Sequence, residues 1–376
     1  MARFGFLSTY PPTRCGLATF TEALAASMGE HGPRVVRVLD EASPVDSPRF
    51  GASVVAAELV GGDSASVRAS IRALNDFDMV IVQHEYGIYG GVDGDEVLAV
   101  LEGLSSPSIV VLHTVLATPT PGQKRVLERV SELATAIVVM SDAARGILET
   151  GYDVVMSKVS VIPHGVATSP ARSLGKAVRP VPGRVLTWGL IGPGKGLEWG
   201  IRAMTHLTDL PSHPQYVIVG RTHPKVLLHE GEAYRRRLEQ LVEDLGLQEH
   251  VRFVDEYLDT DQLAEWVATA EVVLLPYDTE NQVTSGVLVE AVAAGKPVVS
   301  TGFPHSVELL SDGAGVIVAH ADPSSIAEGL RRVLGEAREA ERMSAAATKL
   351  AAGTGWLEVA ARYRGLGADI LSMQAA

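Results

Sequence analysis

The stretch Glu280–Ser300 combines a polar start, a glycine and a single carboxylate within an otherwise apolar segment. Thr284, Ser285 and Gly286 can cap a helix and leave unpaired amide N–H groups at its first turn. Those N–H groups and the positive end of the helix dipole attract an anion. Glu290 lies more than one turn further on, where a helix that serves only the core needs no carboxylate. We therefore predict an anion-binding ligand site in this stretch.

The residues around this site predict the elements that position it. Leu288, Ala291 and Val292 recur at the spacing of one helix face. Gly295 is typical of a helix end, and residues 298–299 are typical of a following strand. The site would then lie where a loop leads into a helix that precedes a strand.

Size, charge and cysteine content narrow the class of protein. The chain has 376 residues with 46% hydrophobic content, enough for two domain cores. A net charge of −13 argues against nucleic acid as a partner, so local cations and helix ends must hold any anionic ligand. Cys15 is the single cysteine, which excludes an internal disulfide. The sequence shows neither a signal peptide nor a membrane span, which predicts a cytoplasmic protein and leaves peripheral membrane contact open.

Strand and helix patterns alternate through the first half of the chain. A strand that opens through a glycine-bearing loop into a helix is typical of the first unit of a doubly wound sheet. The alternation predicts a mainly parallel sheet with helices on both faces. Strands are predicted at Arg3–Ser8, Val35–Leu39, Met79–Val82, Ile109–Leu112, Ala136–Met140 and Val159–Ile162, and helices at Leu17–Met28, Pro121–Leu133 and Ala143–Thr150.

Residues 169–184 are rich in Pro, Gly, Ser and basic residues, which predicts an interdomain linker. The fold class is therefore predicted as α/β, with two Rossmann-like domains, residues 1–168 and 185–352, that face each other across a cleft. Residues 353–376 end in an amphipathic helix that the sequence does not place. In the second half, strands are predicted at Val185–Leu190, Tyr216–Val219, Val251–Val254, Val272–Leu275, Val298–Ser300 and Gly315–Val318, and helices at Leu197–Leu207, Glu230–Leu245 and Gln262–Ala270.

Two loops of the second half could add positive charge to the predicted site. The glycines of Gly189–Gly196, GLIGPGKG, would let the backbone approach a phosphate, and Lys195 would supply a point charge. This is not a Walker A loop, because Gly196 follows the lysine, and an ordinary turn with a solvated lysine fits equally well. Arg221, in the GRTHP segment after the next strand, either reaches the same anion or is an ordinary loop arginine.

Polar residues also follow the predicted strands of the first half. Arg14 and Gly16 come after the first strand, and His84 and His113 end two later ones. Two histidines at equivalent strand ends suit a functional site about as well as they suit hydrogen-bonded packing. They are not at metal-ligand spacing, so we expect no metal. His164 ends the last strand before the linker, and we interpret it as mainly structural.

The ordered set of motifs resembles the family 4 (group 1) glycosyltransferases, which have the GT-B fold. The resemblance covers most of the chain and includes the two halves, the KG turn and the E-A-x-A-x-G-K-P-V-V run. It is strongest to a bacterial group with TYPPxxCGxATF, HEYGIxGG, LHTV, IPHGV, THP and TSGxL motifs. These motifs are present at Thr9–Phe20, His84–Gly91, Leu112–Val115, Ile162–Val166, Thr222–Pro224 and Thr284–Leu288.

This resemblance implies retaining transfer of a hexosyl group from a nucleotide-diphosphate sugar, such as GDP-mannose or UDP-glucose, to a hydroxyl acceptor. The acceptor would be a saccharide, a lipid-linked compound or a small molecule, and neither a cofactor nor a metal is implied. His113, Lys195 and Gln282 would act at the reacting sugar and the diphosphate. Glu290 would hold the ribose hydroxyls. Further donor contacts would come from Gly16, Thr284, Ser285 and Gly286, and acceptor contacts from Arg14, His84, Glu85 and Tyr86.

Two positions depart from the family pattern. Gln282 stands where the E-x7-E motif has its first glutamate, so it can hydrogen-bond a sugar but carries no charge. Leu190 stands where many relatives have an arginine, and we hypothesise that Arg221 replaces that phosphate contact. The alternatives are a sugar-nucleotide epimerase, a phosphorylase, or a non-catalytic sugar-nucleotide-binding partner subunit, the last of which Gln282 favours.

Overall fold

The structure is a computed structural model that describes residues 2–29, 34–40, 54–167 and 179–375. The chain divides into two compact units, Met1–Gly165 with Gly353–Ala376 (unit 1) and Val166–Ala352 (unit 2). Of the predicted linker, residues 169–178 lie outside the described residues, and Arg184 already begins a strand. Each unit has its own parallel sheet and its own core.

Unit 1 contains a seven-stranded sheet with the order β3-β2-β1-β4-β5-β6-β7, in which every neighbouring pair is parallel. The strand order reverses between β1 and β4, which makes their carboxyl ends the switch point where ligands of doubly wound sheets bind. The strands are β1 (Phe4–Ser8), β2 (Arg34–Leu39), β3 (Val55–Val60), β4 (Met79–His84), β5 (Ser108–Leu112), β6 (Ala136–Val139) and β7 (Val159–Val161).

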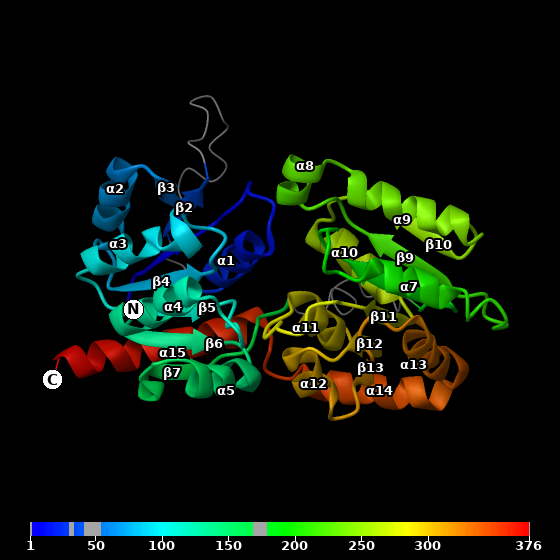
Figure 1. The fold of residues 1–376 in the computed structure, drawn as a ribbon. Helices are drawn as coiled ribbons and strands as arrows, with labels where there is room; N and C mark the ends of the chain where they lie inside the picture. The colour runs from blue at the N-terminus through cyan, green and yellow to red at the C-terminus, as the bar shows by residue number, and fades with distance from the viewer. Residues whose placement is uncertain (1, 30–33, 41–53, 168–178, 376) are drawn as a thin grey trace. The chain divides into compact units, whose positions relative to one another are not determined.

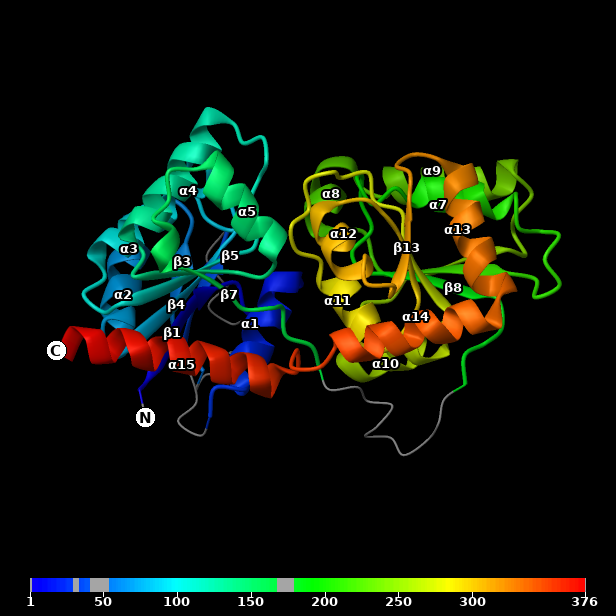
Figure 2. The same ribbon diagram turned by 90° about the horizontal axis from the view of Figure 1, so that it is seen from below.

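The C-terminal helix α15 (Trp356–Ala375) belongs to unit 1 and lies beside α1 (Gly16–Ala26) (Figures 1 and 2). Phe20 of α1 and Tyr363 of α15 are buried in one core with strand residues such as Phe6 and Ile81. The helix that the sequence left unplaced thus completes this core. The other elements of the unit are α2 (Ser64–Leu74), η1 (Val92–Gly94), α3 (Glu96–Gly103), α4 (Pro121–Leu133), α5 (Asp142–Gly151) and η2 (Met156–Lys158).

Unit 2 contains a six-stranded parallel sheet with the order β10-β9-β8-β11-β12-β13, and its switch point lies between β8 and β11. The strands are β8 (Arg184–Trp188), β9 (Gln215–Val219), β10 (Val251–Val254), β11 (Val272–Leu275), β12 (Val298–Thr301) and β13 (Gly315–Val318). The helices are α7 (Leu197–Met204), α8 (Pro224–Glu230), α9 (Ala233–Asp244), α10 (Thr260–Thr269), α11 (Gly286–Ala293), α12 (Pro304–Leu310), α13 (Pro323–Gly335) and α14 (Ala337–Leu350).

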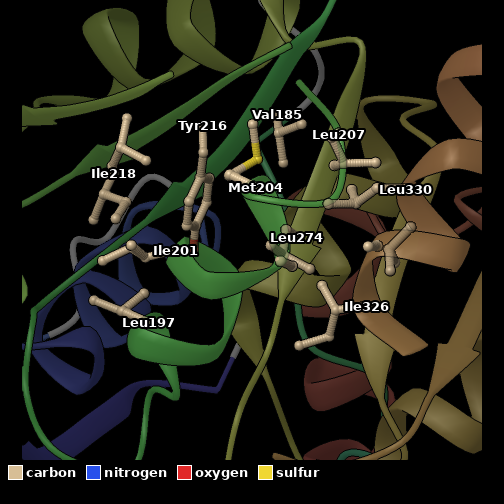
Figure 3. Close-up of a cluster of buried hydrophobic side chains, with 14 of the residues drawn as sticks. Val185, Leu197, Ile201, Met204, Leu207, Tyr216, Ile218, Leu274, Ile326 and Leu330 are labelled. Atoms are coloured by element: carbon tan, nitrogen blue, oxygen red, sulfur yellow. The ribbon is translucent and has the colours of Figure 1, made fainter. Parts of the chain in front are cut away.

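Alternate residues of the unit 2 strands face two separate cores. Val185 and Tyr216 pack with α7, α9 and α13 in the cluster that Figure 3 shows. Leu186 and Val217 pack on the opposite face with α10, α11 and α12. This period-two alternation buries both faces of the sheet, as a parallel sheet requires.

The predicted α/β class and the two doubly wound parallel sheets are confirmed, with differences at element ends. The strand predicted to reach Leu190 ends at Trp188, because Gly189 takes a φ of 115°. The helix predicted over Glu230–Leu245 begins at Ala233, because Gly231 has a φ of 58° and separates it from α8, which ends at Glu230. β3 was not predicted, because this edge strand is mostly half-buried and lacks a continuous apolar run.

Candidate functional site

The glycine-rich turn Gly189–Gly196 follows β8 at the switch point of the unit 2 sheet. It is hydrogen-bonded to the loop that follows β9, because Ile191 N–H donates to the carbonyl of Arg221 at 2.8 Å. In return, His223 N–H donates to the carbonyl of Ile191 at 2.8 Å. The side chain of Arg221 is exposed. The structure therefore brings the predicted KG turn and the GRTHP segment together at one sheet edge.

The same turn fits closely against the loop that follows β11. Gly196 has a φ of 58°, and a Cβ at this position would lie 1.9 Å from the carbonyl oxygen of Pro276, so only glycine fits. Lys195, one residue earlier, is half-buried, and its Nζ lies 4.3 Å from the ring centroid of Tyr277. This is a cation–π distance, and Tyr277 itself is buried. The ammonium group is thereby fixed at the carboxyl end of β11.

Helix α11 begins at the predicted stretch, and the predicted cap is confirmed. The hydroxyl of Ser285 accepts from Leu288 N–H at 3.3 Å. The N–H group of Ser285 donates to Nδ1 of the buried His305 at 3.0 Å. Both groups of Ser285 are thus engaged in shaping the helix start. The predicted anion would therefore have to bind the backbone N–H groups of the neighbouring residues Thr284 and Gly286.

Glu290 of α11 is held by Trp188, the last residue of β8. Nε1–H of Trp188 donates to Oε2 of Glu290 at 3.1 Å, and Oε1 has no hydrogen-bond partner among the described residues. Burial raises the pKa of Glu290, and the bond from Trp188 acts in the opposite direction. The first turn of α11 is close to the glycine turn, since a Cβ on Gly189 would lie 3.9 Å from Val287. Glu290 therefore belongs to the same sheet edge as Lys195.

Gln282 is directed into its own loop. Its side-chain Nε2 donates to the backbone carbonyl of Thr284 at 2.9 Å, and its backbone carbonyl accepts from His305 N–H at 3.3 Å. The side-chain amide therefore helps to shape the approach to α11. The predicted bond to the transferred sugar would have to use the second N–H group or the oxygen of this amide.

In unit 1, His113 follows β5 and is held by Gln83 of β4. Its Nε2 lies 2.6 Å from Oε1 of Gln83, and Phe20 packs against its ring with centroids 4.9 Å apart. Burial lowers the pKa of His113 to about 3, with further contributions from His164 and His84. The ring is therefore neutral at pH 7. With the hydrogen on Nε2 directed to Gln83, Nδ1 is an acceptor.

Two further histidines accompany His113. His84 is fully buried, and neither of its ring nitrogens has a hydrogen-bond partner in the described part of the chain. It faces the opposite side of the sheet from Gln83, because successive strand residues alternate. Nδ1 of His164 lies 2.7 Å from the carbonyl of Gly165, and its ring packs against Trp356 with centroids 5.8 Å apart. Burial lowers the pKa of each of these two histidines to about 4.

The remaining predicted residues of unit 1 lie at the carboxyl ends of β1 and β4. Gly16 begins α1, and a Cβ there would meet nothing within 4 Å, so internal packing does not require a glycine. Arg14 is exposed. The carboxylate of Glu85 accepts from the hydroxyl of Thr114, and the hydroxyl of Tyr86 donates to a backbone carbonyl of α4 at 3.3 Å.

Three further observations on the described residues concern a metal site, a membrane span and a cavity. No group of three or more His, Cys, Asp or Glu side chains among them is arranged to hold a metal ion. None of the described helices has the length and apolar character needed to cross a bilayer. A cavity of about 550 Å³ lies at the amino end of β1, lined by residues that include Arg3, Phe4 and Phe77, away from every predicted residue.

Several contacts of the site come from residues that the sequence did not single out: Gln83, Trp188, Tyr277, His305 and Trp356. Gln83 and Trp188 lie at strand ends and Tyr277 lies two residues after β11, which is the same signal that drew attention to His84, so the sequence could have found them. His305 and Trp356 carry no such signal, because only the folded chain brings their distant segments to the site.

The architecture and the comparison with known families agree. Two doubly wound parallel sheets in tandem define a GT-B fold, and the solved structures that resemble the whole chain share it. Residues 182–336 match the family model described as Glycosyl transferases group 1. This segment of the chain therefore resembles the group 1 glycosyltransferases, and the whole chain has the GT-B fold.

The curated relatives include several D-inositol 3-phosphate glycosyltransferases. The protein from Nocardioides sp. is 30% identical over 258 residues, which are 64% of this chain and 55% of the relative. The protein from Kineococcus radiotolerans is 30% identical over 250 residues, 61% of this chain and 56% of the relative. The chain thus spans about half the length of the curated relatives that it matches.

Two solved structures illustrate the shared fold. Anabaena HepE, in complex with UDP and glucose, has a TM-score of 0.75 and 16% identity, and the match covers 98% of this chain and 100% of HepE. Sucrose-phosphate synthase from Thermosynechococcus elongatus has a TM-score of 0.76 and 18% identity, with 99% and 100% coverage. At this level of identity the likeness concerns the fold.

Proposed function

We propose that this protein transfers a hexosyl group from a nucleotide-diphosphate sugar to a hydroxyl acceptor with retention of anomeric configuration. The observation that carries the proposal is that Lys195, Glu290 and the start of α11 converge on one glycine turn at the unit 2 switch point. A fixed ammonium group and a helix start suit a diphosphate, and a carboxylate suits ribose hydroxyls. The names of the curated relatives and the UDP bound to HepE support a sugar-nucleotide donor.

The proposed reaction breaks the bond between the anomeric carbon and the diphosphate oxygen. The acceptor oxygen forms its bond to that carbon on the same face, and its proton passes to the departing diphosphate. Positive charge then develops on the sugar and negative charge on the leaving group, so fixed cations at the diphosphate lower the barrier. Lys195 and Arg221 would supply this charge, which requires neither a protein nucleophile nor a cofactor.

The donor class can be tested directly by thermal unfolding with UDP-glucose, GDP-mannose and ADP-glucose. A ligand that binds only the folded protein raises the midpoint of unfolding, so one donor should stabilise the protein and the others should not. Incubation of that donor with an acceptor panel should release the nucleoside diphosphate, and NMR should show the donor's anomeric configuration in the product. EDTA should leave the rate unchanged. An inverted product would overturn retention, and the absence of binding to all three donors would overturn the proposal.

A non-catalytic sugar-nucleotide-binding subunit is the second candidate, and the conformation of Gln282 favours it. Its amide nitrogen already donates to Thr284 within the loop, and the side chain has no charge with which to stabilise a reacting sugar. Under this alternative, the protein would bind its donor and yet release no nucleoside diphosphate with any acceptor. If Gln282→Glu then produced turnover, the missing carboxylate would be the cause.

A further inference from the structure

The loop after β9 presents a histidine at the same edge as Lys195. His223 N–H donates to the carbonyl of Ile191 at 2.8 Å, which fixes this residue to the glycine-rich turn. A Cβ built on Gly192 would lie 3.8 Å from Cβ of His223. His223 is only half-buried, so its ring remains accessible from solvent.

The hydrogen-bonding role of each ring nitrogen of His223 follows from its contacts. Nδ1 accepts the N–H group of Lys225 at 3.2 Å and so caps helix α8. A ring nitrogen that accepts a hydrogen bond carries no hydrogen, so the hydrogen of the neutral ring is on Nε2. Nε2 has no hydrogen-bond partner among the described residues. With Nδ1 turned toward the helix backbone, Nε2 is directed away from it as an unused donor.

The surroundings of His223 keep the ring neutral and close to Lys195. Burial lowers its pKa, and the positive charges of Lys225 and Lys195 lower it further. The backbone bond from His223 to Ile191 places this histidine on the same turn that carries Lys195. At pH 7 the site therefore combines one fixed cation with one neutral N–H donor.

Helix α9 supports the loop from the protein interior. Arg235 is buried, and its Nη2 donates to the carbonyl of Gly220 at 2.5 Å and to Asp255 at 3.1 Å. The hydroxyl of the buried Thr222 donates to the carboxylate of Glu232. The residues on the amino side of His223 are thus held by side chains, so the position of its ring does not depend on the α8 cap alone.

We propose that His223 is a further donor-binding residue, whose Nε2–H donates a hydrogen bond to an oxygen of the diphosphate that Lys195 neutralises. The inference rests on the proposed function, because it assumes a nucleotide-diphosphate ligand at this edge. A neutral donor beside a cation gives the phosphate oxygens a direction that a lysine alone, as a flexible point charge, does not provide.

The variant His223→Asn separates binding from helix capping. Asparagine is among the strongest N-cap residues, so its side-chain oxygen can accept the Lys225 N–H in place of Nδ1. Its amide is too short to replace Nε2. We therefore expect His223→Asn to unfold at the temperature of the wild-type protein but to bind a nucleoside diphosphate about tenfold more weakly by calorimetry.

The probes are UDP, GDP and ADP, each compared with its nucleoside. If His223→Asn bound the diphosphate more weakly but bound the nucleoside with unchanged affinity, His223 would act at the phosphates. Wild-type affinity of His223→Asn for the diphosphate would overturn the inference and leave His223 as a cap, while the proposed function would stand. If the wild-type protein bound none of the three diphosphates, the proposed function and this inference would both fail.

Discussion

The carboxyl edges of the two sheets differ in the charge and the burial of the polar residues that we singled out there. In unit 2, Lys195 is half-buried and Arg221 is exposed, so positive charge is accessible at the strand ends. In unit 1, each of His84, His113 and His164 lies beside an aromatic ring, and burial keeps all three neutral. The cations of unit 2 are thus accessible at their sheet edge, whereas the three histidines of unit 1 are uncharged.

This difference in charge fits the proposal that unit 2 binds the diphosphate of the donor and that unit 1 contacts the transferred sugar and the acceptor. A diphosphate needs cations, which the unit 2 edge supplies in a chain with a net charge of −13. The transferred hexosyl group is uncharged, so a neutral imidazole such as His113 suits it better than an imidazolium. Substitutions in unit 2 should therefore affect donor binding, and substitutions of the histidines should first affect stability.

Lys195→Ala should have the largest effect on the unit 2 side of this comparison. Loss of a fixed group that stabilises developing negative charge lowers kcat by roughly 100- to 1,000-fold in other enzymes, and we expect a fall in that range. The measurement is nucleoside diphosphate release with saturating donor and acceptor. Lys225→Ala is the matched control, because it removes an exposed lysine of α8 nearby and should leave kcat within about twofold.

Arg221→Ala tests whether the arginine replaces the contact that Leu190 cannot make. An exposed guanidinium acts in a more screened environment than Lys195, so we expect a smaller loss, about 5- to 10-fold in donor affinity. Unchanged affinity in Arg221→Ala, together with a loss in Lys195→Ala, would refute this replacement.

Glu290→Gln should weaken donor binding and stabilise the folded protein. Loss of a charged hydrogen bond to ribose costs about 1.5–3 kcal/mol, so the donor Kd should rise at least tenfold. The pKa of Glu290 is raised, so the folded state disfavours the ionised form, and this cost develops as the pH rises above the ordinary carboxyl range. The midpoint of unfolding of Glu290→Gln should therefore exceed that of the wild-type protein by more at pH 8 than at pH 4.5.

Glu280→Gln is the matched control for this variant, because it neutralises an exposed carboxylate in the same loop. It should change neither the donor Kd nor the pH dependence of stability. Equal stability of Glu290→Gln and the wild-type protein at both pH values would show that burial does not penalise the charge of Glu290.

Most of the fold could be predicted because buried parallel strands are short apolar runs that loops and helices separate. β4, β5 and β11 are of this kind, and their predicted positions agree with the structure within two residues. The edge strand β3 is only partly buried, so its pattern is weak. The position of α15 depends on contacts with α1 across the length of the chain, which no local pattern encodes.

The candidate site could be predicted only as far as strand ends and helix caps allow. The cap at Ser285 follows from residue type and spacing, and the structure confirms it. The hydrogen bond between Trp188 and Glu290 and the contact between Lys195 and Tyr277 join different loops, so they require the strand order. Residue types at strand ends therefore indicate where a site lies, while its internal contacts come from the fold.

His84→Leu should have the smallest effect, and it tests the unit 1 side of the comparison. Both ring nitrogens of His84 are buried without a partner among the described residues, so an apolar side chain should stabilise the protein by about 1 kcal/mol at pH 7.5. Its pKa of about 4 lies below the ordinary value of 6.5, so the unfolded state binds the proton more tightly, and stability is lost as the pH falls from 6.5 toward 4. The gain in the midpoint of unfolding should therefore be larger at pH 5.5 than at pH 7.5. His229→Leu, which replaces an exposed histidine, should show no such difference. If His84→Leu were less stable than the wild-type protein at both pH values, the imidazole would have to make a favourable polar contact. Burial of an unpaired neutral ring would then not describe this position.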